Sequence, residues 1–172
     1  MALVLNRLPW LPAMLPPRGC GQTWENYLIP VLRAYSEDFA STCPLCHGKP
    51  VAPFYRRSPS VSGYEGGFWH LVTDDPPIPH DHDEAHRVLS EDRCRTIKWP
   101  RPTIEHIDSG VPLVWLQRIS GGMRTHVLLR DVPYLVVLEE DVNVVYLTTA
   151  YPVTRKHTLE QLLDRYNQYG RP

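Results

Sequence analysis

The sequence predicts one α+β domain, with helices before an antiparallel sheet and one helix after it. Apolar residues repeat with a helical period over residues 23–41, and β-branched and aromatic segments separated by short turns fill residues 112–151. A second helical period covers residues 156–169. We expect residues 1–22 to form a flexible arm and residues 23–171 to form a single domain. A chain of 172 residues has a length that is typical of one domain.

Proline placement supports this division. The chain has 18 prolines, about twice the usual share, and ten of them lie between Pro44 and Pro112. Only Pro133 and Pro152 interrupt residues 113–171. The middle of the chain is therefore expected to be rich in loops. Hydrophobic residues at 42% and charged residues at 22% are typical of a globular protein, and no apolar run is long enough to cross a membrane.

The N-terminal half contributes the predicted helices. Thr23 is the expected N-cap of the first helix, and Pro30 either kinks that helix or begins its main segment. Residues 43–67 are rich in Pro, Gly and Ser and are expected to be a loop.

Short elements follow this loop. The aromatic and β-branched run at 68–73 favours a strand, and residues 74–86 form a polar loop. Ser90 is the expected cap of a short helix that ends near Trp99, because a proline follows, and residues 102–106 add one turn.

Four strands joined by short turns are predicted next, at 112–119, 124–130, 134–139 and 144–151. Such spacing is typical of a four-stranded antiparallel meander. The nearly continuous apolar run in the third strand is expected of a central strand that is buried on both faces.

A cluster of cations is the first candidate for function. The net charge is −1, which excludes a generally basic surface but not a local patch. The cluster and its one acid are Arg93, Arg95, Lys98, Arg101 and Glu105. Its guanidinium groups suit a phosphodiester backbone; alternatively, the segment is a solvated helix paired with acids from elsewhere.

Two further candidates are His70 and the segment 148–151. An imidazole titrates near neutrality and suits general acid or base catalysis, although a structural histidine with a satisfied hydrogen bond is the alternative. The hydroxyls of Thr148, Thr149 and Tyr151 can donate to a phosphate, although all three residue types are also common in strands.

Cys43 and Cys46, with His80, His82 and His86 further on, are the candidate zinc ligands. No second Cys-x-x-Cys completes a site, so we expect a surface cluster and no metal. The cysteines are expected to be reduced, and Pro9 and Pro12 interrupt any signal peptide, which predicts a cytoplasmic protein. Nucleotide-binding glycine loops and the hydrolase nucleophile motif are absent from the sequence.

The order of four segments, 68–72, 93–102, 134–138 and 149–151, resembles phage- and plasmid-linked bacterial proteins of the barnase–EndoU–colicin–RelE superfamily. The similarity covers roughly residues 24–169, and its most specific part is the string from Arg93 to Pro102. The resemblance implies N-terminal helices and a four-stranded antiparallel sheet. It also implies a metal-independent endoribonuclease without a cofactor, which acts as a toxin with RNA as substrate and an antitoxin protein as partner.

The resemblance also implies a site. Its catalytic residues are His70, Arg93, Arg95, Thr149 and Tyr151. Beyond these residues, we expect the neighbouring polar side chains to bind the substrate, namely Lys98, Arg101, Glu105 and His106. Either Glu105 or His106 is expected to supply the second proton transfer. The expected reaction is attack of the ribose 2′-hydroxyl on the adjacent phosphorus. Residues 74–90 and the Cys-x-x-Cys lie outside the pattern, and a non-catalytic RNA- or protein-binding module, with or without structural zinc, is the alternative.

Overall fold

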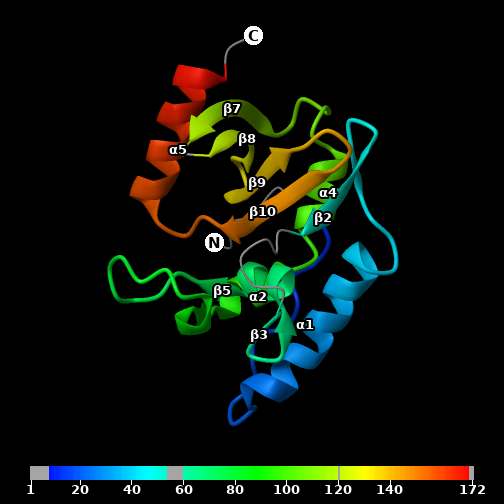
Figure 1. Ribbon diagram of the computed structural model, residues 1–172, viewed down its shortest axis with the longest axis vertical. Helices are drawn as coiled ribbons and strands as arrows, with labels where there is room; N and C mark the ends of the chain where they lie inside the picture. The colour runs from blue at the N-terminus through cyan, green and yellow to red at the C-terminus, as the bar shows by residue number, and fades with distance from the viewer. Residues whose placement is uncertain (1–7, 54–59, 120, 171–172) are drawn as a thin grey trace, which may run out of the picture.

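The computed structural model describes residues 8–53, 60–119 and 121–170. It is an α+β structure with an N-terminal helix, α1 (Trp24–Phe39), a curved sheet and a C-terminal helix, α5 (Lys156–Tyr169) (Figure 1). The predicted fold class is confirmed at this level. None of the helices in the described part of the chain is long and apolar enough to cross a membrane.

The main sheet has six strands in the order β1-β2-β10-β9-β8-β7. The four predicted C-terminal strands pair antiparallel with their sequence neighbours and are β7 (Leu113–Ile119), β8 (Gly122–Leu129), β9 (Tyr134–Glu140) and β10 (Val145–Pro152). However, β2 (Lys49–Pro53) pairs parallel with β10, and β1 (Leu45–Cys46) flanks β2. The sheet is therefore mixed, and a four-stranded antiparallel sheet is not confirmed.

The loop predicted at 43–67 is wrong, because it contains β1, β2 and the small hairpin of β3 (Ser60–Val61) and β4 (Tyr64–Glu65). Strand β2 was not predicted because it contains two prolines, and proline donates no ladder hydrogen bond and disfavours strand interiors. This strand tolerates two prolines because its pairing with β10 covers only three residues. Val51 in its centre is buried, so core packing outweighs the local propensity.

The strand predicted at 68–73 is also wrong, because Gly66–Val72 form helix α2. Phe68, Leu71 and Val72 are buried at helical spacing, so tertiary packing overrides their β-propensity. A Cβ at Gly67 would lie 2.6 Å from Cβ of Pro53, which shows how closely α2 approaches the end of β2.

Short elements complete the segment between α2 and the sheet. They are β5 (Thr73–Asp74), the 3₁₀ helix η1 (Glu84–His86), β6 (Val88–Leu89), α3 (Glu91–Arg95) and α4 (Pro100–Glu105). Pro100 begins α4 at its first turn, where a missing N–H costs nothing. Ser90 is the N-cap of α3 but its side chain makes no capping hydrogen bond, whereas Thr23 accepts one from Asn26 as expected.

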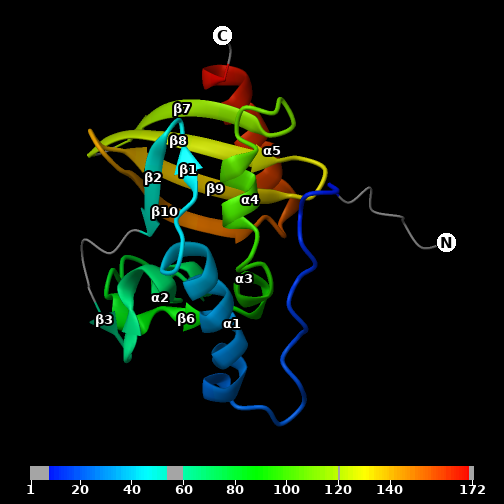
Figure 2. The ribbon, with the colours of Figure 1, turned by 90° about the vertical axis from the view of Figure 1, so that its right-hand side faces the viewer.

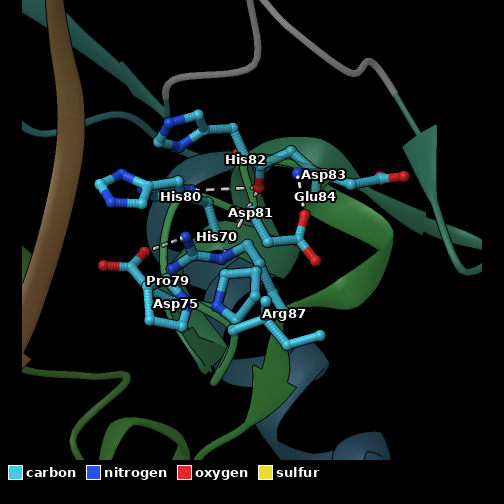
Figure 3. Close-up of a pocket in the computed structure, with 11 residues that line it drawn as sticks. His70, Asp75, Pro79, His80, Asp81, His82, Asp83, Glu84 and Arg87 are labelled. Carbon is cyan, nitrogen blue, oxygen red and sulfur yellow. Dashed lines mark hydrogen bonds and ion pairs between the residues drawn. The ribbon is translucent and has the colours of Figure 1, made fainter.

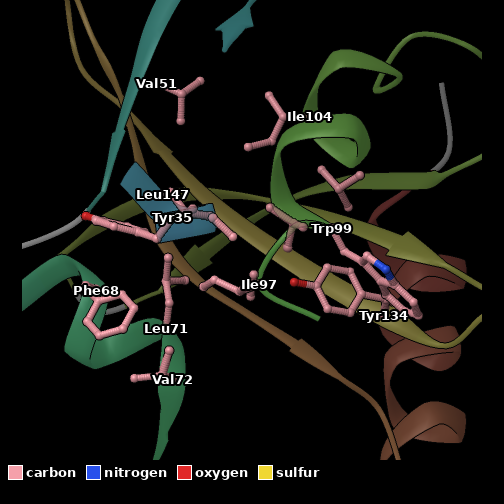
Figure 4. Close-up of a cluster of buried hydrophobic side chains, with 14 of the residues drawn as sticks. Tyr35, Val51, Phe68, Leu71, Val72, Ile97, Trp99, Ile104, Tyr134 and Leu147 are labelled. Carbon is pink, nitrogen blue, oxygen red and sulfur yellow. The ribbon is translucent and has the colours of Figure 1, made fainter. Parts of the chain in front are cut away.

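The two faces of the sheet bury different cores. Val136 and Leu138 face the larger core, which α1 to α4 cover, whereas Leu135 and Val137 face a smaller core under α5. Figure 2 shows α4 and α5 on opposite sides of the sheet, and Figure 4 shows the larger core between α2, the α3–α4 segment and the strands. Strand β9 is thus buried on both faces, as its apolar sequence predicts.

Residues 8–22 lie along the domain and contact it. Leu11 is buried, Trp99 Nε1 donates a hydrogen bond to the Pro12 carbonyl at 2.9 Å, and the Tyr27 hydroxyl donates to the Pro16 carbonyl at 2.9 Å. The apolar residues and carbonyls of this segment thus find partners on α1 and the α3–α4 segment, and the flexibility of residues 1–22 stays a prediction. Residues 1–7 and 171 lie outside the described residues.

Candidate functional site

A cleft of about 850 Å³ is lined by residues of the β5–β6 loop, the end of β10 and the N-terminus of α5. Four predicted catalytic residues line it: His70, Arg93, Thr149 and Tyr151. Charged and hydroxyl side chains that the site prediction omitted also line it: Asp74, Asp75, Arg87, Arg124, Thr148, Arg155 and Thr158. Four arginines against two aspartates give the cleft a positive lining.

Arg93 is fixed at the cleft wall by contacts from two other elements, β5 and β10. Its Nε lies 2.6 Å from Asp74 Oδ1, and its Nη1 donates to Thr149 Oγ1 and to the carbonyl of Ala150, both at 3.3 Å. Its guanidinium carbon lies 4.8 Å from the centroid of the Tyr151 ring. These contacts use Nε and Nη1 of the guanidinium group. The side chain is only 10% exposed, which strengthens the field of its charge in the cleft.

His70 is carried by the last turn of α2 and has an acidic partner. Its Nδ1 lies 3.4 Å from Glu84 Oε2, and its side chain is 23% exposed. Burial, and then the nearby Arg87 cation, lower the pKa of His70 below its usual value. With Nδ1–H directed at Glu84, the neutral ring presents Nε2 as a proton acceptor.

Arg87 lies next to the His70–Glu84 pair. Its side chain is 5% exposed, its Nη1 lies 2.5 Å from Asp75 Oδ1, and its Nε and Nη2 donate to the side chain and carbonyl of Thr73. Nε is also 3.6 Å from Glu84 Oε2. Figure 3 shows Asp75 directed at the guanidinium group. No motif marks Arg87 in the sequence, and only its position at the end of an acidic loop could have suggested it.

A smaller pocket of about 390 Å³ continues from the cleft under the β5–β6 loop and shares His70, Asp75 and Arg87 with it (Figure 3). His86 Nδ1 lies 2.8 Å from Asp81 Oδ2, which raises the pKa of His86 and helps to lower that of Asp81. These are pairwise contacts within an exposed loop.

The structure does not bring the candidate zinc ligands together in one cluster. Within the described ranges, no group of three or more His, Cys, Asp or Glu side chains is arranged to hold a metal ion. Cys43, Cys46, His80 and His82 therefore do not form one. Cys46 is buried beside β2, and burial raises the pKa of its thiol to about 11, so it is not a ready thiolate ligand.

The remaining predicted residues lie outside the cleft. Arg95 Nε donates to the Leu15 carbonyl at 3.3 Å and so holds the N-terminal segment. Arg101 pairs with Glu105 at 2.9 Å and donates to the Asp38 carbonyl of α1. Lys98, Arg101 and Glu105 line a separate pocket of about 300 Å³.

His106 also lies outside the cleft and contacts the N-terminal segment. Its ring stacks on Trp10 with centroids 4.2 Å apart, and its Nδ1 lies 2.8 Å from the Pro102 carbonyl. The predicted site is thus divided between two places, because residues two apart on a helix, such as Arg93 and Arg95, point in different directions.

No family model, no curated protein and no solved structure matches the chain significantly. The chemistry of the cleft residues is therefore the basis for a functional assignment.

Proposed function

We propose that the protein is a metal-independent endoribonuclease that cleaves RNA by attack of the 2′-hydroxyl on the adjacent phosphorus. The observation that supports this most strongly is the convergence of His70, Arg93, Thr149 and Tyr151 on one cleft. These residues come from α2, α3 and β10, which are far apart in the sequence. A neutral histidine beside a fixed arginine is the combination that this reaction needs.

In the proposed reaction, Nε2 of His70 removes the proton of the 2′-hydroxyl. The 2′-oxygen then bonds to phosphorus, and the bond from phosphorus to the 5′-oxygen breaks. Arg93 stabilises the extra negative charge of the phosphorane, which develops only in the transition state. Thr149 orients the Arg93 side chain through a hydrogen bond, and the Tyr151 ring holds the guanidinium group by a cation–π contact.

The second proton transfer needs a group in the cleft. Glu105 and His106, the predicted candidates, lie in or beside the separate pocket on α4. In this proposal His70, protonated in the first step, returns its proton to the departing 5′-oxygen. The products are a 2′,3′-cyclic phosphate and a 5′-hydroxyl, and no metal is needed because the nucleophile belongs to the substrate.

The role as a toxin with an antitoxin partner belongs to the same proposal and is supported only by the resemblance. A non-catalytic RNA- or protein-binding module is the second candidate. It is favoured by one observation, that Arg93 and Arg87 are already paired with Asp74 and Asp75, as structural arginines often are.

The test is incubation of the protein with single-stranded RNA and DNA of one sequence in EDTA. We expect cleavage of RNA alone, with 2′,3′-cyclic phosphate ends, and a loss of about 10²–10⁴-fold in His70→Ala. Arg130→Gln, a change of a surface cation that pairs with Asp131, is the matched control and should cleave at the wild-type rate. Cleavage of DNA at a similar rate, or a strict need for magnesium, contradicts the proposal; RNA binding without cleavage favours the binding module.

A further inference from the structure

Two buried polar atoms in the cleft wall lack hydrogen-bond partners. They are Oγ1 of Thr148 and Nε of Arg124, and neither has a partner among the described residues. Thr148 is only 7% exposed, and both residues line the cleft. Buried donors are nearly always satisfied in native proteins, so two unsatisfied donors in one wall call for a ligand.

A bulge in β10 places Thr148 in this position. The pairing of β10 with β9 shifts between Leu147, which faces Leu138, and Thr149, which faces Val137. Thr148 is therefore an extra residue with no partner across the ladder. Bulges of this kind redirect side chains and are frequent beside functional sites.

The N-terminus of α5 faces the same part of the cleft. Arg155 is the N-cap residue of this 14-residue helix, and no side chain caps it. The first turn contains no acidic residue, and Arg155 and Thr158 line the cleft. The uncapped N–H groups and the helix dipole favour an anion at this point.

The surrounding charges agree with this preference. Arg155 is exposed, and Arg124 is 29% exposed and lies 3.5 Å from Glu139 Oε2, an ion pair whose geometry leaves Nε without a hydrogen bond. All of these groups except Glu139 donate hydrogen bonds or carry positive charge. A phosphate, with several oxygens around one centre, can accept from the arginines, the hydroxyl and the helix N–H groups together.

We propose that Thr148, Arg124, Arg155 and the N-terminus of α5 form a phosphate subsite, separate from the Arg93 group. It binds a phosphodiester that flanks the scissile one, a role that rests on the proposed function. Both unpartnered atoms are shielded from solvent, so the phosphate reaches them only when side chains of the cleft wall rearrange. The subsite thereby directs the bound RNA strand along the sheet, from the β5–β6 loop to α5.

The test uses two probes, inorganic phosphate and a single-stranded oligodeoxynucleotide, which carries phosphodiesters but no 2′-hydroxyl. We expect both to shift the amide NMR signals of residues 155–158, and phosphate to compete with the oligonucleotide. Thr148→Val and Arg155→Gln should each weaken oligonucleotide binding by about tenfold, as measured by fluorescence anisotropy. Arg155→Gln should also reduce the salt dependence by about one phosphate contact, and Arg130→Gln should change neither property.

The stability of the Thr148→Val variant distinguishes a binding role of Thr148 from a structural one. Thr148→Val removes a hydroxyl that has no partner, so we expect unfolding by urea to be unchanged or to require more denaturant. Unchanged oligonucleotide affinity in Thr148→Val and Arg155→Gln, or binding of inorganic phosphate alone, overturns the subsite even if the protein cleaves RNA. Weakened binding in both variants supports it even if no RNA is cleaved, in which case only the proposed reaction fails.

Discussion

The two ends of the basic segment, residues 93–101, differ in the residues that their arginines contact. Arg93 contacts Asp74, Thr149 and the Tyr151 ring, which belong to two other elements and border a cleft. Arg101 contacts Glu105 on its own helix and a carbonyl of α1. The sequence shows equivalent cations, but the short α3 and the new helix that begins at Pro100 direct them to different places. A charge motif thus identifies a segment, whereas the local helix geometry decides which of its charges face the cleft.

The largest expected contrast is between Arg93→Ala and Arg101→Ala. We expect Arg93→Ala to lower kcat/KM for RNA about 10³-fold, because a fixed charge at the reacting phosphate is lost. Arg101→Ala should retain at least half of the activity. The measurement is initial-rate cleavage of one fluorogenic RNA, with circular dichroism to show that both variants fold. Equal losses in the two variants would mean that the division of the basic segment has no functional meaning.

The second contrast concerns pH and is specific to the cleft. Burial and the Arg87 cation lower the pKa of His70, so its neutral form persists at pH values below about 6.5. We expect kcat/KM to stay level from pH 8 to below pH 6.5 and then to fall tenfold per pH unit. An acid limb that begins above pH 6.5 would contradict the role of His70 as a base.

The same shift affects stability. Because the folded state favours neutral His70, this contribution is fully present above the unfolded pKa and is lost as pH falls through the folded pKa. The control is His70→Asn, which should show a weaker dependence of urea unfolding on pH between 7 and 5.

The smallest expected effect on activity is at the other end of the segment. Trp10→Ala removes the stack on His106 and should lower the free energy of unfolding by about 2 kcal/mol. Cleavage per folded molecule should be unchanged, because this ring does not line the cleft. Urea unfolding and RNA cleavage at low temperature measure the two quantities, and Trp10→Phe should restore most of the stability. A loss of cleavage without a loss of stability would instead assign substrate contact to this surface.

The predictable parts of the fold are those with long periodic patterns. The helices α1 and α5 and the strands β7 to β10 carry repeats of many residues, and each was predicted within a few residues. Among the short elements, α3 and α4 lie where Ser90 and the prolines that follow predicted helical turns, whereas α2 and β2 were not predictable because tertiary contacts decide them. The buried face of α2 and the close approach at Gly67 make a helix from residues with β-propensity, and β2 forms despite two prolines.

Only part of the predicted set of site residues lies together in the structure. His70, Arg93, Thr149 and Tyr151 line one cleft, as the resemblance implies, but Arg95 and His106 do not. Arg87, Arg124 and Arg155 were missed because a lone arginine in a loop or strand has no distinguishing pattern. Thr148 was considered only as one hydroxyl of a strand, since a bulge is a property of pairing and is not visible in one segment.

The parallel pairing of β2 with β10 has a consequence for the order of folding. Val51 meets Val145 across this pair, so a long intervening chain must close before the contact forms, whereas β7 to β10 close through short turns. During synthesis, His70 and Arg93 leave the ribosome before Thr149 and Tyr151 do. The nascent chain therefore has no complete cleft until its last strand and the first turn of α5 are available, and any activity of the cleft begins only then.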